Sequence, residues 1–174
     1  SKLYGQYPYP TYSIVQTEFP SGMEYPALVY ISDKYYKPNY SSGPLLIVVV
    51  HETAHQWFYG IVGNDQVDEP WLDESFAAFS ETLFIERTYG KKTGEDYYNR
   101  SVVNSVETAL SSEIIDGGLS KSLSEFNNWD DYGPTAYDRG AQMLKELREK
   151  LGEDMFMEIV RTYVDRYKFR IATT

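Results

Sequence analysis

The sequence predicts an α+β domain in which a small β portion, residues 1–44, is followed by a mainly helical portion, residues 45–174. The first 44 residues are rich in Tyr, Pro and Ser and contain short β-prone runs, whereas the rest of the chain repeats apolar residues at helical spacing. The chain has 174 residues, of which 42% are hydrophobic and 16% aromatic, so it is long enough to bury a core. No repeat or linker divides it. We therefore expect residues 1–174 to form a single domain.

Two short strands are expected in the β portion. The first contains the alternating residues Tyr12-Ser13-Ile14, and the second contains the run Ala-Leu-Val-Tyr-Ile at 27–31. The intervening Pro20-Ser21-Gly22 has the composition of a turn.

The helical portion contains both histidines of the chain in one pentapeptide, His51-Glu52-Thr53-Ala54-His55. Positions i and i+4 of a helix share a face, so two imidazoles at this spacing can bind one zinc ion while Glu52 lies beside them as a base. The preceding run, 45–50, is rich in β-branched residues and taken alone would also suit a buried strand. Because the histidines share a metal only on a helix, we expect this run to be helical and to continue toward Gly60.

The later helices follow from apolar periodicity and from glycine and proline positions. One begins after Asp68, with Pro70 in its first turn, and ends at Gly90. A third is expected around residues 98–110, a fourth opens at Pro134, and a fifth covers 156–167. Apolar positions expected to share faces of the last two are Ala141, Leu144, Leu147, Leu151, Phe156, Ile159, Val160, Tyr163, Val164 and Tyr167. Four aromatic residues near the metal-binding segments are expected in the core: Trp57, Phe58, Phe76 and Phe79.

A third metal ligand is expected from the second helix of this portion. The chain has no cysteine, so a metal is held by histidine and carboxylate alone. Eighteen residues separate His55 from Glu74, which lies in Trp71-Leu72-Asp73-Glu74-Ser75. Three protein ligands leave a fourth position for water, the arrangement of catalytic zinc. Asp73 is either an acceptor for a ligand histidine or a solvated carboxylate at the helix start.

These residues suggest a hydrolytic mechanism. Zinc lowers the pKa of a bound water from about 16 to roughly 7, and we expect Glu52 to take that proton and later to hand it to a leaving amine. A structural zinc in a module that binds a partner is the rival hypothesis. It requires a closed fourth position, for which the chain has no third histidine and no cysteine, although another carboxylate could close it.

Charge and hydropathy restrict the kinds of partner expected for this chain. The net charge of -10 and the scattered Lys and Arg residues disfavour nucleic acid. The longest apolar run, Leu45 to Val50, is much shorter than the ~20 residues of a membrane helix. We expect neither a nucleic acid partner nor membrane contact by this chain.

Two segments, HETAHQWFYG at 51–60 and PWLDESFAAF at 70–79, resemble the zinc aminopeptidases of the membrane alanyl aminopeptidase type. These are gluzincin metallopeptidases with a thermolysin-like catalytic domain. The resemblance implies one zinc ion bound by His51, His55 and Glu74, and peptide substrates with a free amino terminus. The segment 21–26 (SGMEYP) resembles the family's Gly-x-Met-Glu-Asn, which implies that Glu24 binds the substrate amino group. The segment 136–141 (AYDRGA) resembles the one whose tyrosine donates to the oxyanion, which implies that role for Tyr137.

The chain also departs from the family pattern. Tyr25 and Asp73 stand where asparagine is usual, and Ser75 stands where glycine follows the ligand. The family's enzymes carry a front β-sandwich domain and a rear helical domain that 174 residues cannot include, so the resemblance implies the catalytic domain of a longer parent. An endopeptidase or a glycyl aminopeptidase on the same scaffold remains an alternative.

Overall fold

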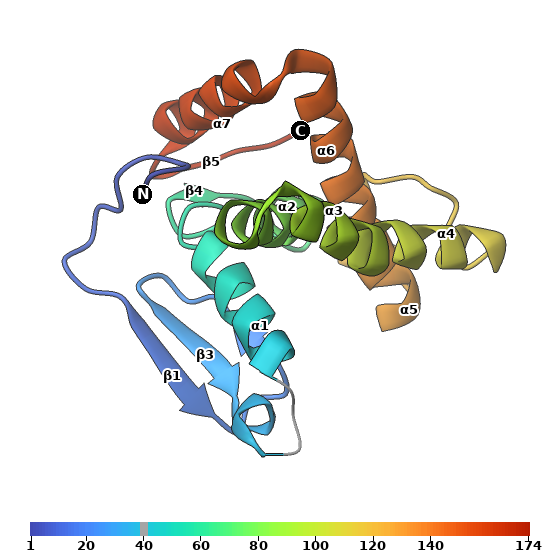
Figure 1. Ribbon diagram of the computed structural model, residues 1–174, viewed down its shortest axis with the longest axis horizontal. Coiled ribbons are helices and arrows are strands. Elements are labelled where there is room, and N and C mark those ends of the chain that lie inside the picture. The colour runs from blue at the N-terminus through green and yellow to red at the C-terminus, as the bar shows by residue number, and fades with distance from the viewer. Residues whose placement is uncertain (39–41) are drawn as a thin grey trace.

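The computed structural model describes residues 1–38 and 42–174, and it has the predicted α+β architecture. A small sheet lies at one end, beside the first helix, and the other helices gather around a central one (Figure 1). Among the described residues, no helix is both long and apolar enough to cross a bilayer.

The sheet contains one strand more than predicted. Its strands are β1 (Ser13–Thr17), β2 (Gly22–Met23) and β3 (Leu28–Ser32), in the order β1-β3-β2. β1 runs parallel to β3, with Ser13 opposite Leu28, and β2 runs antiparallel to β3, with Gly22 opposite Ile31. The expected turn at 20–22 is therefore wrong at its last residue, because Gly22 pairs with β3. A 3₁₀ turn, η1 (Asp33–Tyr36), follows the sheet.

The first helix, α1 (Ser42–Ala54), includes the β-branched run 45–50 and contacts β2 and β3. The helical prediction for this run is confirmed. The helix stops at Ala54, however, well before Gly60. Trp57 and Phe58 turn into the core immediately after it, and the amide of Gly60 donates to the carbonyl of His55 at 2.8 Å, which closes the turn.

The central helix, α2 (Trp71–Tyr89), begins after Asp68 and ends at Gly90 as predicted, but Pro70 is its N-cap and not part of its first turn. Pro70 precedes its first residue, and Gly90 stops it with φ 98°, a conformation that glycine adopts without steric cost. It contacts α1, α3 (Lys91–Tyr98), the π-helical segment η4 (Gly133–Arg139) and α6 (Gly140–Leu151). Its side chains are therefore buried on several sides, and the helix lies at the centre of the helical portion (Figure 1).

The third predicted helix is a continuous run of α3, the π-helical η2 (Asn99–Val103) and α4 (Asn104–Ser111). A 3₁₀ turn, η3 (Leu123–Glu125), lies in the polar stretch that follows. The fourth helix starts earlier than Pro134, with α5 (Trp129–Tyr132), because Asn128 and Asp131 form a capping box. It continues through η4 into α6, and α7 (Glu153–Tyr167) is the fifth. Two further strands were not predicted. β4 (Val62–Gly63) follows α1 in the sequence, and it pairs in parallel with β5 (Arg170–Ile171), near the end of the chain.

The core confirms the expected aromatic packing. Trp57, Phe58 and Phe79 are buried, and Phe76 is partly buried and stacks on Phe58 with ring centroids 4.3 Å apart. The apolar stripes predicted for α6 and α7 are only partly buried, since Leu147, Leu151 and Ile159 remain exposed.

Candidate active site

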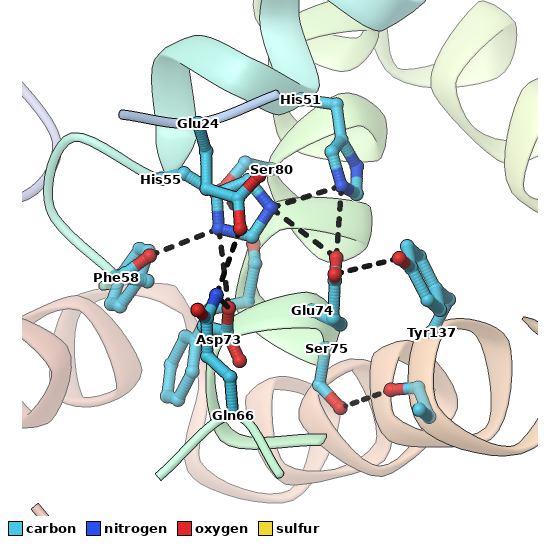
Figure 2. A network of polar contacts seen from close by, with 12 residues as sticks. Glu24, His51, His55, Phe58, Gln66, Asp73, Glu74, Ser75, Ser80 and Tyr137 are labelled. Atoms are coloured by element: carbon cyan, nitrogen blue, oxygen red, sulfur yellow. Dashed lines mark hydrogen bonds and ion pairs between the residues drawn. The ribbon is translucent and has the colours of Figure 1, made fainter. Parts of the chain in front are cut away.

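His51, His55 and Glu74 meet at one point between α1 and α2 (Figure 2). The Nε2 atoms of the two histidines are 3.1 Å apart, and Glu74 Oε2 lies 3.1 Å from His51 Nε2 and 3.2 Å from His55 Nε2. Tetrahedral zinc bonds nitrogen and oxygen at about 2.0–2.2 Å, which separates its ligand atoms by about 3.3 Å. The three atoms therefore have the spacing of three corners of such a site.

The hydrogen-bond partners of the two Nδ1 atoms explain why the two Nε2 atoms face each other. His51 Nδ1 lies 2.8 Å from Glu81 Oε1, and His55 Nδ1 lies 3.0 Å from the carbonyl oxygen of Phe58. Since both partners accept hydrogen bonds, both Nδ1 atoms carry the hydrogen in the neutral rings and both Nε2 atoms present lone pairs. Two lone pairs and a carboxylate oxygen that face one another repel unless a cation lies between them. The donor set fits a divalent metal ion such as Zn²⁺.

Burial and the interactions between the histidines and the nearby carboxylates shift the pKa values of this cluster. Burial lowers the pKa of His51, but hydrogen bonds to Glu74 and Glu81 outweigh it and raise the pKa well above the ordinary value. Burial likewise opposes charging of His55, and the nearby Glu74 raises its pKa to about 9. Burial disfavours ionised Glu74, yet the charge of His55 and the hydrogen bonds from both histidines lower its pKa. Without a metal, protons on the two histidines therefore supply the positive charge that balances the Glu74 carboxylate.

Tyr137 reaches the cluster from η4. Its hydroxyl donates to Glu74 Oε1 at 2.6 Å, and its ring stacks against the His51 ring with centroids 5.5 Å apart. Burial and the charge of Glu74 raise the pKa of Tyr137 well above its usual value, so the hydroxyl keeps its hydrogen and acts as a donor.

Glu52 points from α1 into the same region. Its Oε2 atom is buried and has no hydrogen-bond partner in the part of the chain that the structure describes, and burial raises its pKa to about 7. The backbone of Gly22 lies directly against the carboxylate, since a Cβ at Gly22 would be 1.9 Å from Glu52 Oε1. Glycine at this position is therefore what leaves room for the carboxylate.

Glu24 lies just beyond β2 and is buried. Its Oε1 atom accepts a hydrogen bond from Gln66 Nε2 at 2.8 Å, and the same nitrogen donates to Asp73 Oδ2 at 2.7 Å (Figure 2). Asp73 is 1% exposed, so the solvated alternative for this carboxylate is wrong. It also accepts from Asn64, and its Oδ2 is 3.7 Å from His55 Nδ1, whose hydrogen bond goes to Phe58 instead.

A cavity of about 280 Å³ brings the candidate residues together. The candidate residues that line it are Glu24, His51, Glu52, His55, Glu74 and Tyr137. The other residues of its lining are Ser21, Gly22, Ile47, Val48, Glu81 and Trp129.

The whole chain, residues 1–174, matches the family model described as the peptidase family M1 domain. The chain belongs to peptidase family M1. It is 30% identical to endoplasmic reticulum aminopeptidase 1 of Mus musculus over 128 residues, which are 72% of this chain and 13% of that protein. It is also 30% identical to aminopeptidase N of Lactobacillus helveticus, over 72% of this chain and 15% of that protein. The chain thus spans only a small part of the length of these relatives.

Solved structures confirm the fold expected for an M1 catalytic domain. Native leukotriene A4 hydrolase of Saccharomyces cerevisiae superposes with a TM-score of 0.82 at 23% identity, over 99% of this chain and 28% of that one. An M1 zinc metallopeptidase of Deinococcus radiodurans superposes with a TM-score of 0.71 at 24% identity, over 99% of this chain and 36% of that one. The resemblance to zinc aminopeptidases inferred from the sequence is confirmed at the level of the family, and membership of M1 implies zinc.

The structure accounts for one departure of this M1 chain from the expected pattern. Ser75 Oγ donates to the carbonyl of Ala136, the residue before Tyr137, at 2.8 Å. Gly140 makes room for this serine, because a Cβ there would be 1.6 Å from Ser75 Oγ. Ser75 therefore ties α2 to the segment that carries Tyr137. Tyr25, another departure, is exposed and its ring meets Tyr30 edge to face.

Several residues around this candidate site were missed from the sequence, among them Gly22, Gln66, Glu81 and Trp129. Glu81 alone had a local signal, because it follows Glu74 by seven residues, two helical turns, and so lies on the same face of α2. Gln66, Gly22 and Trp129 belong to other segments, and their proximity depends on packing.

Proposed function

We propose that this chain is the catalytic part of a zinc aminopeptidase that hydrolyses the amino-terminal peptide bond of peptides. The observation that carries the proposal is that three side chains with the spacing of metal ligands, the buried carboxylate of Glu52 and a second buried carboxylate, Glu24, line one cavity. The names of the relatives support it, since several are aminopeptidases, and a Deinococcus radiodurans metallopeptidase was determined bound to a Tyr-Ser-Ala substrate.

In this proposal His51, His55 and Glu74 hold one Zn²⁺ ion. Bound zinc supplies Lewis acidity toward the scissile carbonyl and makes water acidic near neutral pH. Glu81 and the Phe58 carbonyl hold the Nδ1 hydrogens of the two histidines, so both Nε2 lone pairs stay directed at the ion.

Glu52 is the proton acceptor. Burial raises its pKa to about 7, near working pH, and a cation at the triad would lower that pKa again. Among the described residues, its Oε2 has no competing hydrogen-bond partner. The carboxyl then holds the proton for transfer to the leaving amine. Tyr137 is proposed to donate to the developing oxyanion. Its hydroxyl donates to Glu74 in the absence of substrate, and the hydrogen can turn about the C–O bond toward a substrate oxygen.

Glu24 is the proposed anchor for the substrate ammonium. A buried carboxylate whose Oε1 is held by Gln66 offers a fixed negative charge, and a charge-assisted contact of this kind is strong when water is excluded. An anchor at a fixed distance from the metal admits one residue before the scissile bond, which makes the enzyme an exopeptidase.

The test uses the full-length protein, with metal analysis and hydrolysis of an alanyl or leucyl anilide. Glu52→Gln is expected to retain zinc and to lose about 10²–10⁴-fold in kcat, the usual contribution of a general base. Retained zinc with unchanged turnover would remove Glu52 from this role.

Blocked peptides separate the exopeptidase from the endopeptidase. The wild-type enzyme is expected to cleave peptides with a free amino terminus and to leave their amino-terminally acetylated counterparts intact. Equal cleavage of both would instead indicate an endopeptidase on the same scaffold. Tightly bound zinc without turnover of either substrate would favour the structural zinc of a binding module.

A further inference from the structure

A hydrogen-bonded chain lies behind His51, on the side away from the cluster of ligand atoms. Glu81 of α2 places Oε1 2.8 Å from His51 Nδ1, and its other oxygen, Oε2, accepts a short hydrogen bond from the hydroxyl of Tyr97 on α3. Only 12% of the His51 side chain and 14% of the Glu81 side chain are exposed. Three successive helices, α1, α2 and α3, are thus joined through one carboxylate.

The packing of α3 on α2 fixes where the Tyr97 hydroxyl lies. Gly94 is buried in this contact, and a Cβ there would be 2.7 Å from Glu86 Cβ and 2.8 Å from Glu86 Cα. Only glycine permits so close an approach. Tyr97 follows Gly94 by three residues and so lies on the same face of α3, directed at α2.

The Tyr97 hydroxyl can serve only as a donor toward Glu81. Burial, and then the negative charge of Glu81, raise the pKa of Tyr97 above its usual range, so the phenol keeps its hydrogen at any working pH. A carboxylate has two oxygens that rotate about one bond, and a donor on Oε2 fixes that rotation. The remaining oxygen then stays in line with His51 Nδ1.

We propose that Tyr97 is a positioning residue of the metal site, which acts on His51 through Glu81. The inference rests on the proposed zinc site and extends it by one residue beyond the groups that contact the ligands. Without the Tyr97 hydroxyl, a partly buried carboxylate oxygen loses its donor and Glu81 turns toward water. His51 then loses the fixed acceptor that keeps its hydrogen on Nδ1 and its lone pair at the metal.

The test is the dissociation constant of zinc, measured in the full-length protein by competition with a chromophoric chelator. Tyr97→Phe keeps the ring and removes the hydroxyl, and we expect affinity for zinc to fall about 10-fold, within the 10–100-fold range for groups that support ligands. Tyr98→Phe is the matched control, because Tyr98 packs against the core and Lys145 Nζ lies 5.4 Å from the centroid of its ring. This control is expected to leave zinc affinity unchanged.

Three further measurements separate positioning from general stabilisation. In a Glu81→Gln background, Tyr97→Phe is expected to have little added effect on zinc affinity, since the pathway is already interrupted. Absorption by Co²⁺ placed in the site is expected to change in Tyr97→Phe and not in Tyr98→Phe. Urea unfolding of the metal-free variants reports folding alone, so loss of stability without loss of zinc affinity would overturn the role.

The outcomes also distinguish failure of the proposed metal site from failure of the proposed role of Tyr97. A wild-type protein that binds no zinc would overturn the metal site and the role of Tyr97 with it. A wild-type protein that binds zinc, together with a Tyr97→Phe variant within twofold of its affinity, would overturn only the role of Tyr97. Equal losses in the wild-type and Glu81→Gln backgrounds would show that Tyr97 does not act through Glu81.

Discussion

Gly22→Ala is a test of how closely the sheet confines the proposed base. The three atoms nearest to an added Cβ all belong to Glu52, at 1.9 Å from Oε1, 2.4 Å from Cδ and 2.7 Å from Cγ. Real Cβ atoms essentially never approach another heavy atom within 3.0 Å. The strand cannot easily retreat, because Gly22 pairs with Ile31 and the Ser32 amide donates to the Ser21 carbonyl at 2.7 Å. The Glu52 side chain must therefore move.

The size of that movement sets the expected effect. The carboxylate oxygen must withdraw by about 1 Å to reach the minimum separation, and a misplacement of about 1 Å can cost on the order of 10²-fold in rate. We expect kcat for an alanyl anilide to fall about 100-fold. Zinc affinity is expected to change little, since the three atoms nearest to the new methyl group belong to Glu52 and not to His51, His55 or Glu74.

The assay compares anilide hydrolysis and zinc affinity for the wild type, Gly22→Ala and a control. Gly118→Ala is a suitable control because a Cβ at Gly118 would approach nothing more closely than the Asp116 carboxylate, at 3.2 Å, and would meet none of the candidate site residues among its nearest atoms. Activity of Gly22→Ala within twofold of wild type would refute the reasoning that Gly22 fixes Glu52. A loss of zinc along with activity would place the effect in folding instead.

Three further predictions concern the same cavity. Burial raises the pKa of Glu52 from 4.5 to about 7, so between these values the folded metal-free protein binds more protons than the unfolded chain and loses stability as pH rises. Glu52→Gln is therefore expected to raise the free energy of unfolding in urea with a metal chelator at pH 8, by up to about 3 kcal/mol, and not at pH 4. A gain that is the same at both pH values would contradict this. Glu24→Gln removes the proposed ammonium partner and is expected to raise KM for free-amine anilides at least about 10-fold, the effect of losing a charge-assisted contact, with zinc retained; an unchanged KM would reject the anchor. Ser75→Ala removes the hydroxyl that donates to the Ala136 carbonyl and is expected to cost about 0.5–1.5 kcal/mol of unfolding free energy and to lower kcat through Tyr137; a variant as stable and active as wild type would show that this bond is dispensable.

The sequence predicted the helices better than the small strands. Long apolar periodicity placed α2 and α7, and a glycine marked the end of α2, because apolar spacing is a local signal that repeats over several turns. Strands of two residues, such as β2 and β4, have no periodicity of their own and exist only because a partner segment lies beside them. The early end of α1 at Ala54 arises from the turn of Trp57 and Phe58 into the core, which the histidine spacing does not reveal.

The sequence by itself determined the ligand types and their local order. With two histidines one helical turn apart and no cysteine, only His51, His55 and carboxylates can hold a metal, and the resemblance of short segments added Glu74, Glu24 and Tyr137.

Only the tertiary structure decided which of those groups meet and what supports them. The hydrogen bonds of Gln66 to Glu24, of Tyr137 to Glu74 and of Tyr97 to Glu81 join residues 42, 63 and 16 positions apart, and the contact of Gly22 with Glu52 joins the sheet to α1. The physical reason is range: helical geometry fixes side chains three or four residues apart, whereas contacts between elements depend on how closely whole helices and strands pack.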